Sequence, residues 1–345
     1  MTRAPATRPR RAFVFGGGGV LGFAWMLGAL AAVEEHTGCD SRDADLVLGT
    51  SAGAVLAGLL GCDLPLDALC RHHQGVALPE DPQLRYDYTG TGTALPPRPG
   101  WRPAAPGLAW LGLRHPRQVS PLVALSGLLP TGRGTLAPIH DLLATVARQA
   151  GFDRDWPQRP RPWVVAVDQS TGRRVVFGRD TVARGPGGLV RIVSRVPLAD
   201  AVTASCSIPG WYRPTLIDGV AHIDGGIASN ASLDLLRDVA LDEVFALIPM
   251  GGRGAPDPRT PLARVDRWVR RAVSRTVAED VAVLRARGVR VHVLVPQPRD
   301  IEVIGVNLMD PAPRAAVLQT ARQTVAEQLD GADPATRRST AGGQA

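Results

Sequence analysis

Lysine is absent from this 345-residue sequence, so all 39 of its basic residues are arginines. They outnumber the 32 acidic residues and give a formal net charge of +7, so phosphate-rich partners have to be considered. The arginines accompany many alanines, glycines and prolines, which indicates a biased coding composition rather than selection for phosphate binding. Because no basic stretch is interleaved with aromatics and no zinc-finger spacing occurs, we expect no nucleic-acid binding.

Cysteine is also scarce. The four cysteines form no Cys-x-x-Cys pair; they are Cys39, Cys62, Cys70 and Cys206. This sparse spacing fits a reducing compartment, where each thiol serves as a small apolar filler. No histidine–cysteine cluster has the spacing of metal ligands, and we expect neither a metal nor an organic cofactor.

Long uninterrupted apolar runs are missing as well. No charge appears from 16 to 33, but this segment opens with four glycines and is interrupted again by Gly22 and Gly28. It therefore predicts a buried core helix rather than a membrane span. Residues 1–11 carry arginines and prolines, but the apolar segment after them does not resemble a signal peptide. We expect a cytoplasmic protein, and peripheral contact with a membrane surface stays open.

The sequence does contain alternating strand-like and helix-like segments. Short apolar runs predict strands at 11–15, 46–48, 163–167, 174–177, 243–248 and 291–295. Helices are predicted at 20–36, 66–73, 139–149, 198–205 and 314–329. Such alternation is typical of an α/β sheet covered on both faces. We expect one domain over 11–330, a disordered basic arm at 1–10 and a disordered tail at 331–345.

The segment 78–135 differs from the rest because it is rich in proline and glycine and shows no clear period. Segments of this kind inside a domain usually serve as lids or binding loops, or are disordered. The apolar pieces 108–113 and 121–129 argue against simple disorder. We interpret the segment as an insertion that covers the active site; membrane contact and an insertion without a role are the alternatives.

Ser51 lies at the centre of Gly49-Thr50-Ser51-Ala52-Gly53, between a strand-like run and a helix-like one. This arrangement is typical of a nucleophile elbow, a sharp turn that lifts the serine hydroxyl out of the sheet edge. The flanking glycines allow strand and helix to pack closely around the turn. The pattern predicts that Ser51 is a catalytic nucleophile.

The loop Gly16-Gly17-Gly18-Gly19 follows the first predicted strand and opens a helix. Its N–H groups carry no side chains and can stabilise an oxyanion together with the helix dipole, which makes Gly17, Gly18 and Gly19 candidate donors. Gly17-x-Gly19-x-x-Gly22 also matches the dinucleotide-binding fingerprint, which expects an acid at the end of the second strand. No acid ends that strand here, but a nucleotide-binding oxidoreductase is kept as an alternative.

The general base is harder to choose because seven histidines are present. His292 satisfies the order of an α/β-hydrolase triad, but it lies within an apolar strand, where histidine is more often a packed core residue. Asp224 is better placed, since it enters the Gly225-Gly226 turn, which can aim a carboxylate at a neighbouring strand end. We therefore favour a Ser51–Asp224 dyad.

Three motifs resemble, in the same order, the signatures of the patatin-like phospholipase family: 17–22 (GGGVLG), 49–53 (GTSAG) and 224–226 (DGG). The run 204–210 and Asn230 fit the same pattern, and the resemblance extends over about residues 12–329. It implies a three-layer α/β/α fold with a central, mostly parallel sheet, and a hydrolase that acts on a lipid or ester substrate. It implies Ser51 as nucleophile, Asp224 as base and the glycine loop as oxyanion hole. The motif glycines are Gly22, Gly49, Gly53, Gly225 and Gly226.

Two positions depart from the family's pattern. Leu21 stands where Arg or Lys is usual, and Ser232 where proline is usual. Because the oxyanion donors are backbone groups, Leu21 need not abolish catalysis, but a cation that could pair with a lipid phosphate is missing. We expect a weaker preference for phospholipids over uncharged esters. The alternatives are that Leu21 only packs against the first helix and that the protein is a catalytically silent lipid-binding member of the family.

Overall fold

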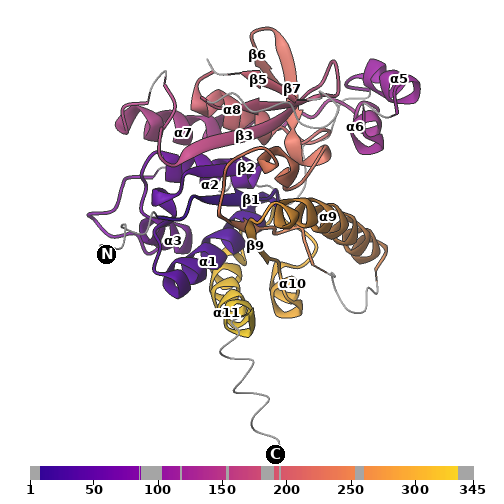
Figure 1. The fold of residues 1–345 in the computed structure, drawn as a ribbon. Coiled ribbons are helices and arrows are strands. Elements are labelled where there is room, and N and C mark those ends of the chain that lie inside the picture. Colours follow the sequence, from indigo (N-terminus) through magenta and orange to yellow (C-terminus); the bar gives the residue numbers. More distant parts are fainter. Residues whose placement is uncertain are drawn as a thin grey trace, which may run out of the picture.

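The computed structural model describes residues 8–84, 86, 103–116, 119–152, 155–179, 190–193, 196–252 and 260–332. Within them one sheet runs through the molecule, with helices on both faces (Figure 1). Its strands are β1 (Arg11–Phe15), β2 (Leu46–Thr50), β3 (Arg161–Asp168), β4 (Arg174–Phe177), β5 (Val190–Val193), β6 (Thr215–Ile217), β7 (Val220–Asp224), β8 (Glu243–Leu247) and β9 (Arg290–Leu294). The α-helices are α1 (Gly19–Thr37), α2 (Ala52–Gly61), α3 (Leu66–Gln74), α5 (Pro106–Arg114), α6 (Pro121–Ser126), α7 (Ala137–Gln149), α8 (Leu198–Ser205), α9 (Pro261–Ala286), α10 (Pro298–Ile304) and α11 (Arg314–Ala332).

The strands follow the order β5-β4-β3-β2-β1-β8-β9, and the β6–β7 hairpin joins the sheet through β7, which pairs with β3. The neighbours from β3 to β9 are parallel, whereas β4 and β7 run antiparallel to β3. The strands predicted from the apolar runs are all present, with ends that differ by at most a few residues. The central sheet is therefore mostly parallel, as predicted.

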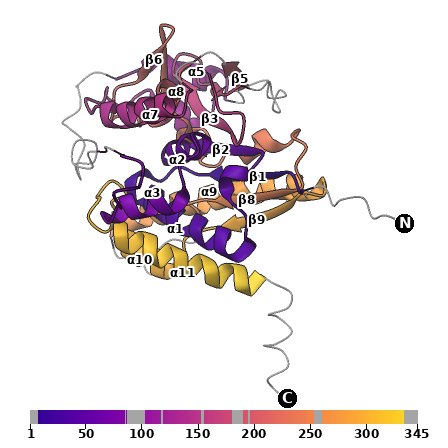
Figure 2. The same ribbon diagram turned by 90° about the vertical axis from the view of Figure 1, so that its left-hand side faces the viewer.

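The two faces of the sheet bury alternate side chains of each strand. Phe13 and Phe15 of β1 face a core built with α1, α2, α7, α8 and α11. Ala12 and Val14 face a second core, which α9 and the segment 231–241 complete. This alternation follows from the two-residue period of a strand. It yields the predicted three-layer arrangement: α1 and α9 lie on opposite sides of the sheet in Figure 1, and Figure 2 looks onto the layer that contains α1 and α11.

Helix α1 is the predicted core helix. Its central residues are almost fully buried, because the sheet covers one side of it and α11 the other. The two helices approach so closely that a Cβ on Gly28 would lie 2.0 Å from the carbonyl oxygen of Leu318, so a glycine is required there. Across the described residues, no helix combines the length and the apolar character that a membrane crossing needs.

Helices α5 and α6 lie within the segment 78–135. A proline stands at the start of each, and the Ser120 hydroxyl caps α6 by accepting the N–H of Val123. The pair packs Leu108, Val119 and Val123 against the sheet residues Val167 and Ile223. That the segment covers the active site stays a prediction, and its part 87–102 lies outside the described residues.

The ends of the chain are described only in part. Residues 1–7 of the predicted arm and 333–345 of the predicted tail lie outside the described residues. At the end of the arm, Arg10 forms an ion pair with Asp242. The carbonyl oxygen of Arg10 also accepts hydrogen bonds from the N–H groups of Asp242 and Glu243 at the start of β8. These contacts fix where β1 begins beside β8.

Candidate active site

The sheet brings the ends of β2 and β7 together on one side of β3. Strand β2 runs parallel to β3 and ends with Thr50 opposite Val165, while β7 runs antiparallel to β3 and ends with Asp224 opposite Ala166. The two carboxyl ends therefore point toward each other along β3. Asp224 is thus placed next to Ser51, which follows Thr50, although the two residues lie far apart in the sequence.

Ser51 occupies a strained turn. Its φ of 55° and ψ of −121° lie outside the regions that a residue with a side chain prefers. The flanking glycines let the turn close: a Cβ on Gly53 would lie 2.1 Å from the Phe15 carbonyl oxygen, and one on Gly49 would lie 2.3 Å from the Gly53 oxygen. Ser51 therefore has the conformation of a nucleophile elbow, as the glycine spacing predicted.

Ser205, which was not predicted as a site residue, holds this turn in place. Its Oγ accepts the backbone N–H of Ser51 at 2.8 Å and donates to the Val165 carbonyl oxygen at 2.6 Å. Ser205 is fully buried at the end of α8. The only sequence signal was its place in the run 204–210, which resembles the family's pattern.

The Asp224 carboxylate lies beside the hydroxyl of Ser51, and this neighbour acts to lower its pKa. The Asp224 Oδ1 accepts the N–H of Gly226 at 2.7 Å, which fixes its orientation within the turn. Asp224 is only 5% exposed, and this burial raises its pKa to about 6, against the opposing effects of the Ser51 hydroxyl and the Gly226 N–H. The carboxyl is therefore mostly ionised at neutral pH, and it can accept a proton more readily than an ordinary aspartate.

The glycine loop lies beside Ser51. A Cβ on Gly17 would lie 3.4 Å from the Ser51 Cβ, so a side chain there would crowd the hydroxyl. The N–H of Gly17 donates to the Asn230 carbonyl at 3.3 Å, and the Asn230 Nδ2 donates back to the Gly17 oxygen at 3.2 Å. Within the described part of the chain, the N–H groups of Gly18 and Gly19 have no such protein acceptor. Both stand at the N-terminus of α1, where negative charge is stabilised.

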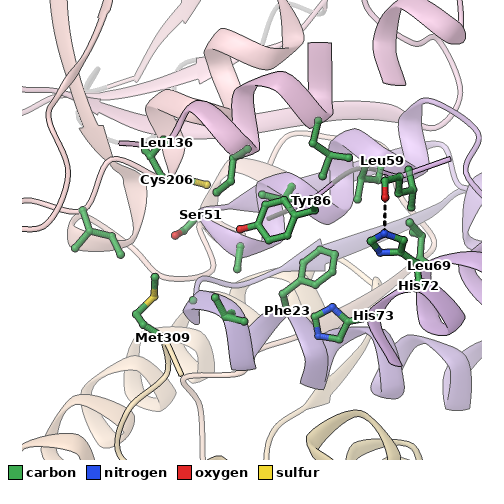
Figure 3. A pocket seen from close by; sticks show the side chains of 18 of the residues that line it. Phe23, Ser51, Leu59, Leu69, His72, His73, Tyr86, Leu136, Cys206 and Met309 are labelled. Carbon is green, nitrogen blue, oxygen red and sulfur yellow. Dashed lines mark hydrogen bonds between the residues drawn. The ribbon is translucent and has the colours of Figure 1, made fainter. Parts of the chain in front are cut away.

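A cavity opens on one side of Ser51. It runs between α1, α2, α3 and α7 (Figure 3). Ser51, Cys206 and Met309 lie at one end, and Leu59, His72 and His73 lie toward the other. Most of its lining is apolar, and burial lowers the pKa of His73 to about 3, so this imidazole is neutral. The cavity can accept an uncharged, flexible chain.

A wider groove opens on the other side of Ser51. It is lined by Asp224, Asn230 and the glycine loop, by residues of α6 and α9, and by the segment 306–309. Of the described residues that line it, none is basic. The contributions of Trp268 on α9 and of Met309 were not predicted, because nothing in their local sequence marks them as site residues.

The two departures from the family's pattern have structural explanations. Leu21 is fully buried in the core, and its N–H donates to the Leu308 carbonyl at 3.0 Å, so its side chain packs and does not face the groove. Ser232 has a φ of 51° and donates its N–H to the Ser229 hydroxyl, and proline could do neither. The burial of Leu21 supports the alternative interpretation, that it is a packing residue.

His292, the residue considered for a triad, stacks on Phe245 with the ring centroids 4.6 Å apart. Its Nε2 lies 3.3 Å from a Glu243 oxygen. It lies on β9, separated from β2 by β1 and β8, and it lines neither the cavity nor the groove. The structure therefore does not bring His292 to Ser51.

Comparisons with solved structures return proteins of low sequence identity. VipD from Legionella pneumophila is 15% identical, with a TM-score of 0.43 over 94% of this chain and 67% of its own. The type III effector ExoU is 17% identical, with a TM-score of 0.38 over 94% of this chain and 53% of its own. Human GIVD cytosolic phospholipase A2, solved with methyl gamma-linolenyl fluorophosphonate, is 12% identical, with a TM-score of 0.39 over 93% and 58%. This chain thus spans between about half and two thirds of their lengths.

A match to a family gives the firmer result. The model of the family described as "Patatin-like phospholipase" matches residues 13–237, well over half of the chain. These residues contain the glycine loop, the elbow at Ser51 and the turn after Asp224, which the fold assembles into one site. No comparison favours the dinucleotide-binding alternative. The chain belongs to the patatin-like phospholipase family.

Proposed function

We propose that the protein hydrolyses carboxylic ester bonds of lipids, with Ser51 as nucleophile and Asp224 as general base. The observation that carries this proposal is the placement of Ser51, at the end of β2, beside the buried Asp224 carboxylate at the end of β7. A serine hydroxyl is a weak nucleophile until an adjacent base takes its proton. A pKa of about 6 suits Asp224 to that task near neutral pH.

The reaction has two halves. In the first, Ser51 Oγ attacks the ester carbonyl carbon while its proton passes to Asp224. The tetrahedral intermediate then expels the alcohol, which takes that proton, and an acyl group stays on Ser51. In the second half, Asp224 takes a proton from water, the water oxygen attacks the acyl carbon, and the fatty acid leaves as Ser51 regains its proton.

The oxyanion of both intermediates is assigned to the glycine loop. Among Gly17, Gly18 and Gly19, the last two supply the main donors, because the Gly17 N–H already donates to the Asn230 carbonyl. The dipole of α1 adds a favourable field at the same point. Backbone donors of this kind are fixed before the charge develops, so little reorganisation is needed during the reaction.

The two hollows around Ser51 suggest how the substrate lies. The apolar cavity is suited to the acyl chain, and the groove to the alcohol part of the ester. Because no described residue that lines the groove is basic, we propose an uncharged ester rather than a phospholipid as the better substrate. A lipid substrate also implies peripheral contact with a membrane surface.

Fluorophosphonate labelling tests the proposal, since only an activated serine should react. The wild-type protein should be labelled and should hydrolyse long-chain esters, and Ser51→Ala should lose both properties while its thermal unfolding is unchanged. The His292→Gln variant is the control, because His292 contacts Glu243 and Phe245 and lines neither hollow. Absence of labelling in a folded wild-type protein would favour a catalytically silent member of the family.

A further inference from the structure

Exposed apolar side chains gather around the groove beside Ser51. Of the twelve large apolar side chains that are exposed in the described part of the chain, five line this groove: Leu122, Leu125, Leu129, Trp268 and Val306. Each is at least 45% exposed. Single exposed apolar residues are normal, but several around one opening indicate an interaction site.

Four more of the twelve lie next to these five. Trp110 and Leu113 belong to α5, which packs against α6, and Leu113 is 78% exposed. Leu128 precedes Leu129, and Val265 stands three residues before Trp268 on α9. The nine residues come from three separate segments of the chain, and we call them the docking face.

The charges around the docking face are mostly positive. On α9, the exposed residues Arg264, Arg271 and Arg275 are spaced at minus four, plus three and plus seven from Trp268, which places them on its side of the helix. Helix α9 has six arginines and three acids: Asp266 forms an ion pair with the buried Arg270, Asp280 lines the groove, and Glu279 precedes it.

The α5–α6 region has the same character. Its described residues between 103 and 140 contain no Asp or Glu, and the Arg114 guanidinium lies 5.2 Å from the Trp110 ring centroid. Trp and Leu side chains flanked by Arg are the composition of helices that lie in a membrane interface, where the arginines meet lipid phosphates.

We infer that the docking face binds the surface of an anionic lipid bilayer, with the groove opening toward the lipids. The inference rests on the proposed function only for why lipid should reach Ser51, since binding itself needs no turnover. The bilayer explains both observations together, because apolar side chains would enter the acyl region while the surrounding arginines pair with headgroups. Lipid could then pass from the bilayer to Ser51 without crossing water.

The test measures binding of the full-length Ser51→Ala protein to vesicles, so that no lipid is consumed. Co-sedimentation with vesicles of equal parts phosphatidylglycerol and phosphatidylcholine should show binding, and added salt should weaken it. In this background, Trp268→Ala and Leu125→Ala should each weaken binding about tenfold, since each removes a large apolar side chain from the contact. Leu78→Ala is the matched control, because Leu78 is 42% exposed but does not line the groove.

A second pair of variants tests the charge. Arg271→Gln combined with Arg275→Gln should weaken binding to the anionic vesicles and make it less sensitive to salt. Thermal unfolding of every variant should match the parent, which separates lost contact from lost fold. Three results would overturn the inference: no vesicle binding, equal loss with Leu78→Ala, or a dimer in solution that Trp268→Ala dissociates. The last would make a second copy of the chain the occupant of the docking face.

Discussion

The cavity and the groove meet at Ser51 but differ in width, exposure and polarity. The cavity is narrow, lies among buried helices and is lined mainly by apolar side chains. The groove is wider, is bordered by exposed side chains and includes the carboxylates of Asp224 and Asp280. If the substrate lies as we propose, selection among acyl chains depends on the cavity, whereas the alcohol group meets a more open surface.

The largest effect is expected from replacing Asp224, the proposed general base, because every ester needs it wherever its two parts bind. Asp224→Asn should lower kcat for every ester by roughly 10³-fold, because general-base catalysis contributes about 10²–10⁴-fold. In the wild-type protein, activity should rise with pH through about 6, since Asp224 must be deprotonated to accept the Ser51 proton. The pH profile of kcat/KM measures this. A profile that is flat from well below to well above this pH would rule out Asp224 as the base.

The next effect concerns stability. Leu21→Arg should lower the free energy of unfolding by about 3–5 kcal/mol, because it places an unpaired charge where a fully buried leucine packs. Chemical denaturation measures it. If the variant were stable and hydrolysed phospholipids faster, position 21 would have to reach the groove, and the assignment of Leu21 to the core would fail.

The next prediction tests whether the cavity determines the length of the acyl chain that the enzyme accepts. Leu59 lies toward the end of the cavity away from Ser51 (Figure 3). Leu59→Phe should lower kcat/KM for long-chain esters about thirtyfold relative to acetate esters. The larger ring fills the end of the cavity, so several methylenes of a long acyl chain can no longer be buried there. Leu59→Ala should shift the optimum toward longer chains. Equal effects of both variants on short and long esters would show that the acyl chain does not lie in this cavity.

The smallest effect is expected from adding a positive charge to the groove. Val306→Arg introduces a cation at an exposed groove position, and a charge-assisted contact with phosphate is worth about 1.5–3 kcal/mol. Turnover of short-chain phosphatidylglycerol should rise about tenfold relative to a diacylglycerol of equal chain length, both as monomers. Val76→Arg is the control, because Val76 is similarly exposed but does not line the groove. An equal gain with the control would assign the effect to overall charge.

The parts of the site that could be predicted are those encoded within a few residues. The elbow at Ser51 depends on Gly49 and Gly53, where a side chain would collide with nearby backbone atoms. The spacing of these two glycines around the serine is visible in the sequence. The turn after Asp224 is local in the same way, since the Asp224 carboxylate accepts the N–H of Gly226 two residues later. The sheet could be predicted from the alternating apolar segments, because strands and helices have different periods of apolar residues.

The parts that could not be predicted depend on contacts between distant segments. Ser205 supports Ser51 only because α8 ends beside β3. Met309 reaches the glycine loop from the segment between α10 and α11, and a Cβ on Gly19 would lie 2.8 Å from its sulfur. No local pattern in the sequence fixes such contacts, since they depend on how helices pack across the finished sheet. The exposed Trp268 belongs to the same group.

The packing of α1 against α11 has a consequence for how the protein acquires activity during synthesis. Helix α1 is apolar on nearly all sides, and part of its surface is covered only by α11, through the contact of Gly28 with Leu318. A nascent chain that has reached β9 contains the whole elbow but still exposes that surface, which is aggregation-prone. It also lacks Leu308 and Met309 beside the glycine loop. Ester hydrolysis should therefore begin only once residues 308–332 have been made and folded onto α1.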